Sequence, residues 1–283
     1  MRRRSLAMIA MAGCGLFPDT SGLSGGVDGA PADASVDAPL VDAPTEASAE
    51  DVAVDAPPVA PHVVAVWNNL DNTDAPVQSL TVPIANAAGD ALLACVREGT
   101  NDTDAFTVGD DKSQIWTQTK SGYESVNVSS RMSCFWVAKS TAVGSVTVTF
   151  TTVGGAARCS MTVLDVAGAD ASSFEDGSVG IGATRDGVTS SLPSGTLSTT
   201  HGNDLLVYYA GLGDDVTTWI AGTGFAIPSN DVTPGLSGSN ARTVIQVESV
   251  SSIQTDVTTS ISWMPTIAAG HGEMGLFLAI RGG

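Results

Sequence analysis

Short apolar runs, separated by turn-forming residues, make up the chain from His62 to Gly283. Several of them alternate apolar and polar residues with a period of two, as in Ser145 to Thr151, and β-branched residues are frequent. This pattern is typical of strands in an antiparallel sandwich or barrel. No strong period of 3.6 residues occurs, which argues against an α/β enzyme fold. The expected strands are 63–67, 79–83, 91–96, 115–119, 132–138, 145–151, 159–166, 192–198, 205–210, 243–250, 257–263 and 274–280.

An internal repeat divides this region into two halves, about 77–168 and 192–283. Four matched pairs of segments indicate it: 89–95 with 203–209, Asp110-Asp111 and Trp116 with Asp214-Asp215 and Trp219, 131–150 with 242–263, and 161–168 with 275–282. One sheet alone would leave an apolar face in water. We therefore predict a single all-β, jelly-roll-like antiparallel β-sandwich in which the two halves interleave. The motif set resembles a jelly-roll-like domain of secreted bacterial proteins, which implies fold and compartment but no enzymatic activity.

The first fourteen residues form a short leader sequence with a basic, an apolar and a small-residue part. Arg2 to Arg4 precede an apolar run from Leu6 to Ala12, and Gly13-Cys14 follow. This layout resembles the signal peptide of bacterial lipoproteins, which implies cleavage after residue 13 and lipidation of Cys14. The run is too short to span a bilayer of about 30 Å. An ordinary secretory signal is the alternative. The resemblance implies an exported protein anchored in the lipid bilayer of the cell envelope, at the outer membrane or cell surface.

Residues 14–61 change character again. From Gly15 to Pro61 the chain carries nine acidic residues and no Lys or Arg, and Val-Asp-Ala-Pro occurs three times. Such a segment has too little apolar bulk to offset chain entropy, so we expect a disordered tether. A random coil of this length spans roughly 40 Å. Acidic spacers of this composition resemble those of myxobacterial lipoproteins.

Three further cysteines, Cys95, Cys134 and Cys159, lie in predicted strands. In an exported domain one disulfide among the three is expected, and the pairing stays open because any two strands can be neighbours. The alternative is that all three are buried reduced thiols.

Motifs for catalysis are weak. His62, His201 and His271 form no spaced ligand pair, which disfavours zinc. The sequence shows no nucleophile elbow, phosphate loop or dinucleotide fingerprint. Calcium is the cofactor that the sequence allows, because carboxylates gather in two turns; the alternative is solvated turn residues. The candidate ligands are Asp102, Asp104, Asp110, Asp111, Asp214 and Asp215.

Aromatic side chains supply the candidate binding residues. Trp67, Tyr123 and Trp263 are candidates for stacking on a sugar ring, with core packing as the alternative. Trp116 and Trp219 occupy matched places in the repeat, so we expect both in the core. The domain holds 9 Lys and Arg against 21 Asp and Glu, a net charge of −12, which disfavours nucleic acid as a partner.

The sequence therefore predicts a lipid-anchored envelope protein whose β-sandwich is a non-catalytic binding or adhesion module, with polysaccharide or another surface component as the partner. A carbohydrate-active enzyme on a jelly-roll scaffold is one alternative, since the many carboxylates could supply an acidic pair. A structural envelope protein is the other.

Overall fold

A computed structural model describes residues 59–71, 73–99, 105–126, 130–151, 154–184, 189–228, 241–267 and 272–283. These residues belong to one compact unit, Asp55–Gly283. The leader, Cys14 and residues 15–58 of the tether lie outside the described part of the chain, so the predictions for them stay predictions. Within the described residues, no helix has the length and hydrophobicity that a membrane crossing requires.

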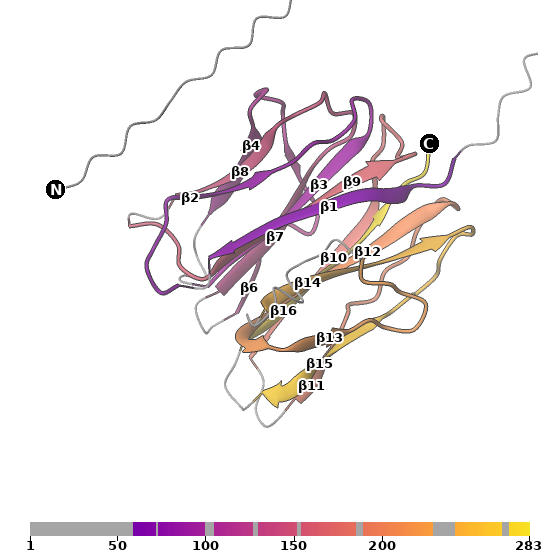
Figure 1. The fold of residues 1–283 in the computed structure, drawn as a ribbon. Helices are drawn as coiled ribbons and strands as arrows, with labels where there is room; N and C mark the ends of the chain where they lie inside the picture. Colours follow the sequence, from indigo (N-terminus) through magenta and orange to yellow (C-terminus); the bar gives the residue numbers. More distant parts are fainter. Residues whose placement is uncertain are drawn as a thin grey trace, which may run out of the picture. The chain divides into compact units, whose positions relative to one another are not determined.

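The described domain is all-β and antiparallel, as predicted. Figure 1 shows its strands, coloured by their position in the sequence. The first half contains β1 (His62–Asp71), β2 (Ser79–Pro83), β3 (Ala91–Glu98), β4 (Phe106–Asp110), β5 (Thr117–Gln118), β6 (Glu124–Val126), β7 (Ser130–Val137), β8 (Ser145–Phe150) and β9 (Cys159–Ala167). The second half contains β10 (Glu175–Thr184), β11 (Thr189–Pro193), β12 (Asp204–Val216), β13 (Thr218–Ile220), β14 (Ala241–Val250), β15 (Ser260–Ile267) and β16 (Gly272–Ile280).

Each half forms its own pair of sheets. In the first half the orders are β1-β9-β3-β7-β5, with β6 also on β7, and β2-β8-β4. In the second half they are β10-β16-β12-β14 and β11-β15-β13. Most successive strands cross between the two sheets of their own half, and this arrangement is compatible with jelly-roll winding. The same order appears twice, so the internal repeat is a repeat of topology.

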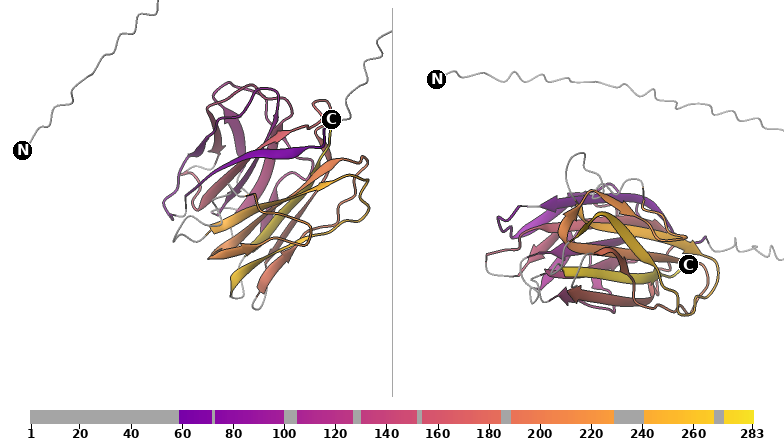
Figure 2. Two further views of the ribbon diagram at one scale, coloured as in Figure 1. Left: turned by 45° about the vertical axis from the view of Figure 1, so that its right-hand side comes forward. Right: turned by 90° about the horizontal axis from the view of Figure 1, so that it is seen from below.

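The expected interleaving of the halves is wrong, because no sheet of the described residues contains strands from both repeats. Figures 1 and 2 show the two halves as separate bodies, one coloured indigo to magenta and the other orange to yellow. The halves also begin earlier than the repeat boundaries of about 77 and 192, since the first starts with β1 at His62 and the second with β10 at Glu175. The two halves instead stack on each other. This stacking covers the apolar faces that a single sheet would expose to water.

Four sheets therefore stack with three apolar layers between them. The middle layer, which we call the seam, packs the larger sheet of one half on the larger sheet of the other, through residues such as Leu93, Leu164, Val207 and Leu278. A second layer lies inside the first half and a third inside the second half. β3 and β16 are buried on both faces, and this explains why their sequences read as continuous apolar runs.

The strand registers show which residues correspond between the repeats. Leu93 lies opposite Trp136 on β7, and its counterpart Val207 lies opposite Val247 on β14. Trp136 and Val247 are therefore equivalent. Outside β7, Thr117 pairs with Trp136, and outside β14 an isolated bridge joins Ala226 to Val247. The segment before Ala226 is thus the counterpart of the segment before β5.

This register corrects the match between Trp116 and Trp219. Trp116 precedes Thr117, so its counterpart is Phe225, and both side chains are half-buried against the layer inside their own half. Trp219 lies on β13, whose place in the sheet corresponds to β4. The sequence match failed because Asp110 ends β4, whereas Asp214 and Asp215 belong to the end of β12.

Candidate functional site

Two grooves open where the seam reaches the surface. One has a volume of about 240 Å³ and is lined by Thr117, Gln118, Lys120, Trp136, Ser172, Ser173, Phe174 and Glu175. We call it the polar groove. The other has a volume of about 280 Å³ and is lined by Val63, Val64, Ala65, Val66, Leu205, Pro228, Val247 and Ser249. We call it the aliphatic groove. Each takes residues from both repeats.

The two grooves occupy equivalent places in the repeat. Trp136 lines the polar groove, and its counterpart Val247 lines the aliphatic groove. Glu175 pairs with Ile280 on β16 just as Val63 pairs with Val166 on β9, so these two lining residues also correspond. The backbone frame is shared, whereas the side chains differ in kind. At these two positions the polar groove carries an indole and a carboxylate, whereas the aliphatic groove carries two valines.

An aromatic pair forms the apolar wall of the polar groove. Trp136 on β7 stacks on Phe174, with ring centroids 4.7 Å apart and an angle of 23° between the planes. Phe174 precedes β10 and is 1% exposed, and its carbonyl accepts a hydrogen bond from the backbone N–H of Arg281. Offset stacking of this kind stabilises a ring pair beyond its area burial. Phe174 therefore fixes the position of the half-buried indole.

Hydrogen bonds join the two repeats along the same groove. The backbone N–H of Lys120 donates to both carboxylate oxygens of Glu175, at 3.1 Å each, and Lys120 Nζ donates to the Glu175 carbonyl at 3.2 Å. The N–H of Ser121 donates to Ser178 Oγ at 2.9 Å, and Ser178 Oγ donates to Glu175. The Glu175 carboxylate is buried and already has donors. It is a structural part of the groove wall.

β5 carries the polar groups at the mouth of the groove. Gln118 Nε2 donates to Ser133 Oγ on β7 at 2.8 Å, which holds the amide in one orientation. The neighbouring Thr117 is exposed. Thr117 pairs with Trp136 and Gln118 with Phe135, so the Thr117 side chain shares the face of Trp136 and the Gln118 side chain lies on the other face of the sheet. Among the described residues, the Thr117 hydroxyl has no hydrogen-bond partner, so it is available to a ligand.

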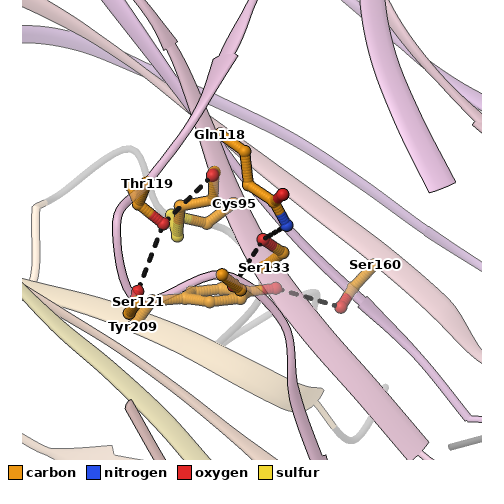
Figure 3. Close-up of a disulfide and its surroundings, with 9 residues drawn as sticks. Cys95, Gln118, Thr119, Ser121, Ser133, Ser160 and Tyr209 are labelled. Carbon is orange, nitrogen blue, oxygen red and sulfur yellow. Dashed lines mark hydrogen bonds between the residues drawn. A yellow bond between two sulfur atoms is a disulfide. The ribbon is translucent and has the colours of Figure 1, made fainter. Parts of the chain in front are cut away.

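The disulfide joins β7, the strand next to β5, to β3. Cys95 on β3 and Cys134 on β7 face each other directly and are joined, with their Cα atoms 4.1 Å apart. Cys159 is buried and takes no part in the bond. Figure 3 shows that Thr119, Gln118, Ser133 and Tyr209 surround the disulfide. Thr119 donates from its backbone N–H to the Cys134 carbonyl at 3.0 Å, so the chain around β5 is held on the bridged strand.

The three aromatic candidates from the sequence do not meet in one site. Trp263 is in the middle of β15 and is 1% exposed, packed edge to face with Trp219 at 5.8 Å; its proposed role in ligand stacking is therefore wrong. Trp67 is inside β1, not at its end, and is half-buried. Tyr123 donates its hydroxyl to the Phe106 carbonyl and lies 4.2 Å from the Arg131 guanidinium, so it makes internal contacts.

The calcium candidates are used within turns or lie outside the description. Asp110 accepts hydrogen bonds from the backbone N–H of Lys112 and from Trp116 Nε1, both at 2.8 Å, and Asp111 accepts one from Gly144. Asp102 and Asp104 are outside the described residues, as is the side chain of Asp215. Asp214 lies near the end of β12, in the other repeat from Asp110 and Asp111. Within the described residues, no three His, Cys, Asp or Glu side chains form a group that could hold a metal ion.

Two buried carboxyl groups with raised pKa values lie outside the grooves. Asp165 on β9 is 2% exposed, and its burial together with the nearby Asp90 raises its pKa to about 6. Asp204 on β12 is fully buried, and burial together with the nearby Asp176 raises its pKa to about 6. Hydrogen bonds from Thr200 and His201 outweigh partial burial and lower the pKa of Asp176 to about 2. Neither pair lines one of the two grooves.

Sequence reasoning missed Trp136, because it looked for aromatic residues at strand ends and in loops. The available signal was the repeat itself, since Trp136 aligns with a valine in the other half. No family model matches the chain, and no curated protein matches it. The proposal for function therefore depends on the sequence leader and on the groove.

Proposed function

We propose that this protein is exported and lipid-anchored at the bacterial cell envelope, and that its double β-sandwich is a non-catalytic binding or adhesion module for polysaccharide. The observation that supports binding is the difference between the two equivalent grooves. A groove needed only for packing has no requirement for an indole and an ammonium group. The combination of an apolar wall with a few oriented polar groups is characteristic of ligand sites.

The proposed location is supported by the leader, in which basic and apolar segments precede Gly13-Cys14. We expect mass spectrometry of the mature protein, expressed in a bacterium, to show an N-terminal Cys14 carrying a lipid-sized mass. A Cys14→Ser variant should lack that mass. An unmodified N-terminus in the native protein would contradict the anchoring.

Binding is tested with the full chain carrying Cys14→Ser, which is free of the lipid. We expect it to sediment with insoluble polysaccharides or with intact bacterial cells, and to elute when soluble fragments of the same glycan are added. Absence of binding to every glycan and every cell type in the panel would overturn the proposed function.

A further inference from the structure

We propose that the polar groove holds one uncharged sugar ring of a polysaccharide chain, in contact with both repeats at once. The inference rests on the proposed function and names the ligand class for that site. It is drawn from the size, the wall, the polar groups and the charge of the groove.

The size of the groove limits what it can accept. Its volume of about 240 Å³ is below the range of about 300–1,000 Å³ that is usual for pockets of drug-sized ligands. The site therefore has room for a single ring, and the rest of a glycan chain would run over the surface. This form of recognition suits a polymer, whose neighbouring units continue into solvent on either side.

The wall of the groove matches the apolar face of a sugar ring. Trp136 contributes the ring surface, and Phe174, stacked behind it at 4.7 Å, holds the indole in place. Because the indole is already fixed, little side-chain entropy is lost when a ligand packs on it. Val247 in the aliphatic groove offers no such planar surface.

The polar groups match hydroxyl groups. A sugar hydroxyl both donates and accepts hydrogen bonds, and the groove offers both functions: the Lys120 ammonium group donates, and the Thr117 hydroxyl, on the same face of the sheet as Trp136, does either. Lys120 is held against the Glu175 carbonyl of the second repeat, so a ring in the groove contacts both halves.

The charges favour an uncharged ligand. Lys120 and Glu175 supply one charge of each sign. The Glu175 carboxylate is buried, and its oxygens accept hydrogen bonds from the Lys120 backbone N–H and the Ser178 hydroxyl. The domain around them has a net charge of −12, from 9 basic and 21 acidic residues. A polyanionic chain would be repelled along its whole length, whereas a neutral chain would not.

The test is isothermal titration of the full chain carrying Cys14→Ser with neutral hexose oligosaccharides (cellohexaose, laminarihexaose and maltohexaose) and with hexagalacturonate as the anionic comparison. We expect at least one neutral oligosaccharide to bind and hexagalacturonate not to bind. Trp136→Ala should weaken the binding by at least about tenfold, and Trp136→Phe by less, because Phe keeps an aromatic ring. Val247→Ala, at the equivalent position, is the matched control and should bind as the parent does.

A second variant guards against a folding defect in Trp136→Ala. Thr117→Arg places a long side chain at the exposed mouth without entering the core, and it should also abolish binding. Binding that survives both variants, a preference for hexagalacturonate, or no binding of any neutral oligosaccharide would overturn the inference. Retention of cell or polysaccharide binding by Trp136→Ala and Thr117→Arg would leave the proposed function intact and reject only this groove.

Discussion

At the scale of single residues, Asp204 and Asp165 are the groups for which burial and charge conflict most directly. Both lie in the interior and each faces a second carboxylate, Asp176 and Asp90 respectively. An ionised carboxylate loses hydration when buried, and a neighbouring negative charge adds to that loss. The raised pKa values of about 6 mean that the folded state binds protons more tightly than the unfolded chain, whose Asp pKa is near 3.8.

These two groups predict a pH dependence of stability. Because their folded pKa values are raised, their contribution is fully present below about pH 4 and is lost as the pH rises through 6. We expect the free energy of unfolding to fall between pH 4 and pH 7, by up to about 3 kcal/mol for each group. Asp176, with its lowered pKa, acts in the opposite direction, and only below pH 4.

Chemical denaturation across this pH range measures the effect. Asp204→Asn removes the ionisation and should flatten the curve, with higher stability than the parent at pH 7. Asp256→Asn, at an exposed turn residue, is the control and should leave the slope unchanged. A parent curve that is flat between pH 4 and pH 7 would contradict the assignment.

Trp219 and Trp116 should differ in their contribution to stability, although the sequence predicted similar roles. Trp219 is 6% exposed and packs on Trp263, so Trp219→Ala should cost about 3–5 kcal/mol. Trp116 is half-buried, and its main polar contact is with Asp110, so Trp116→Ala should cost clearly less. Urea unfolding of the two variants measures this, and equal losses would contradict the expected effect of their different burial.

At the scale of elements, the β10 strand shows why its sequence escaped notice. Glu175 to Thr184 is rich in glycine and reads as a linker, yet it is an edge strand paired with β16 along its length. A Cβ on Gly180 would lie 1.7 Å from the Glu124 side chain of β6. Any side chain there would have to displace Glu124, because β6 of one repeat packs directly on β10 of the other.

Gly180→Ala is therefore expected to disturb the seam. The added methyl group displaces Glu124, and overpacking of this kind typically costs about 1–3 kcal/mol. The matched control is Gly109→Ala, since Gly109 is also in a strand, but a Cβ there would meet nothing within 4 Å. Thermal unfolding compares the two variants. Equal melting temperatures would mean that Glu124 on β6 moves aside without any loss of stability.

The sequence predicted the fold to the extent that each strand carries its own pattern. β3, β9 and β16 are continuous apolar runs, and β8 alternates, so their existence and the repeat could be read directly. β4, β6, β10 and β13 were missed because they are short or glycine-rich and gain stability from neighbours. The polar groove was missed for the same reason: Trp136 and Glu175 are far apart in sequence, and only the stacking of the halves brings them together.

At the scale of the whole molecule, the seam joins two complete sandwiches, and the one covalent cross-link among the described residues lies within the first. Cys95 and Cys134 are separated by 39 residues in sequence. Closing such a loop restricts the unfolded chain, which stabilises the fold by about 2–4 kcal/mol. The first repeat therefore gains a stabilising element that the second lacks, because Tyr209 and Ile245 occupy the positions that correspond to Cys95 and Cys134.

Reduction should consequently lower the melting temperature of the oxidised protein. The Cys95→Ala/Cys134→Ala double variant should have the melting temperature of the reduced parent protein and should no longer respond to a thiol reductant. Cys159→Ala is the control and should keep the response, because Cys159 takes no part in the bond. An oxidised parent whose melting is insensitive to reductant would contradict a stabilising disulfide.

The position of β1 also determines how mechanical force enters the domain. Tension on the chain before Val59 acts first on β1, the edge strand whose His62 lies opposite Ala167 on β9. A force perpendicular to β1 breaks the hydrogen bonds between β1 and β9 one at a time, starting at His62. A force along β1 loads all of these hydrogen bonds together. β7 and β5, which border the polar groove, are at the other side of the same sheet, and the disulfide locks β7 to β3. A load transmitted through the proposed lipid anchor would therefore strain β1 and β9 before it reaches the polar groove.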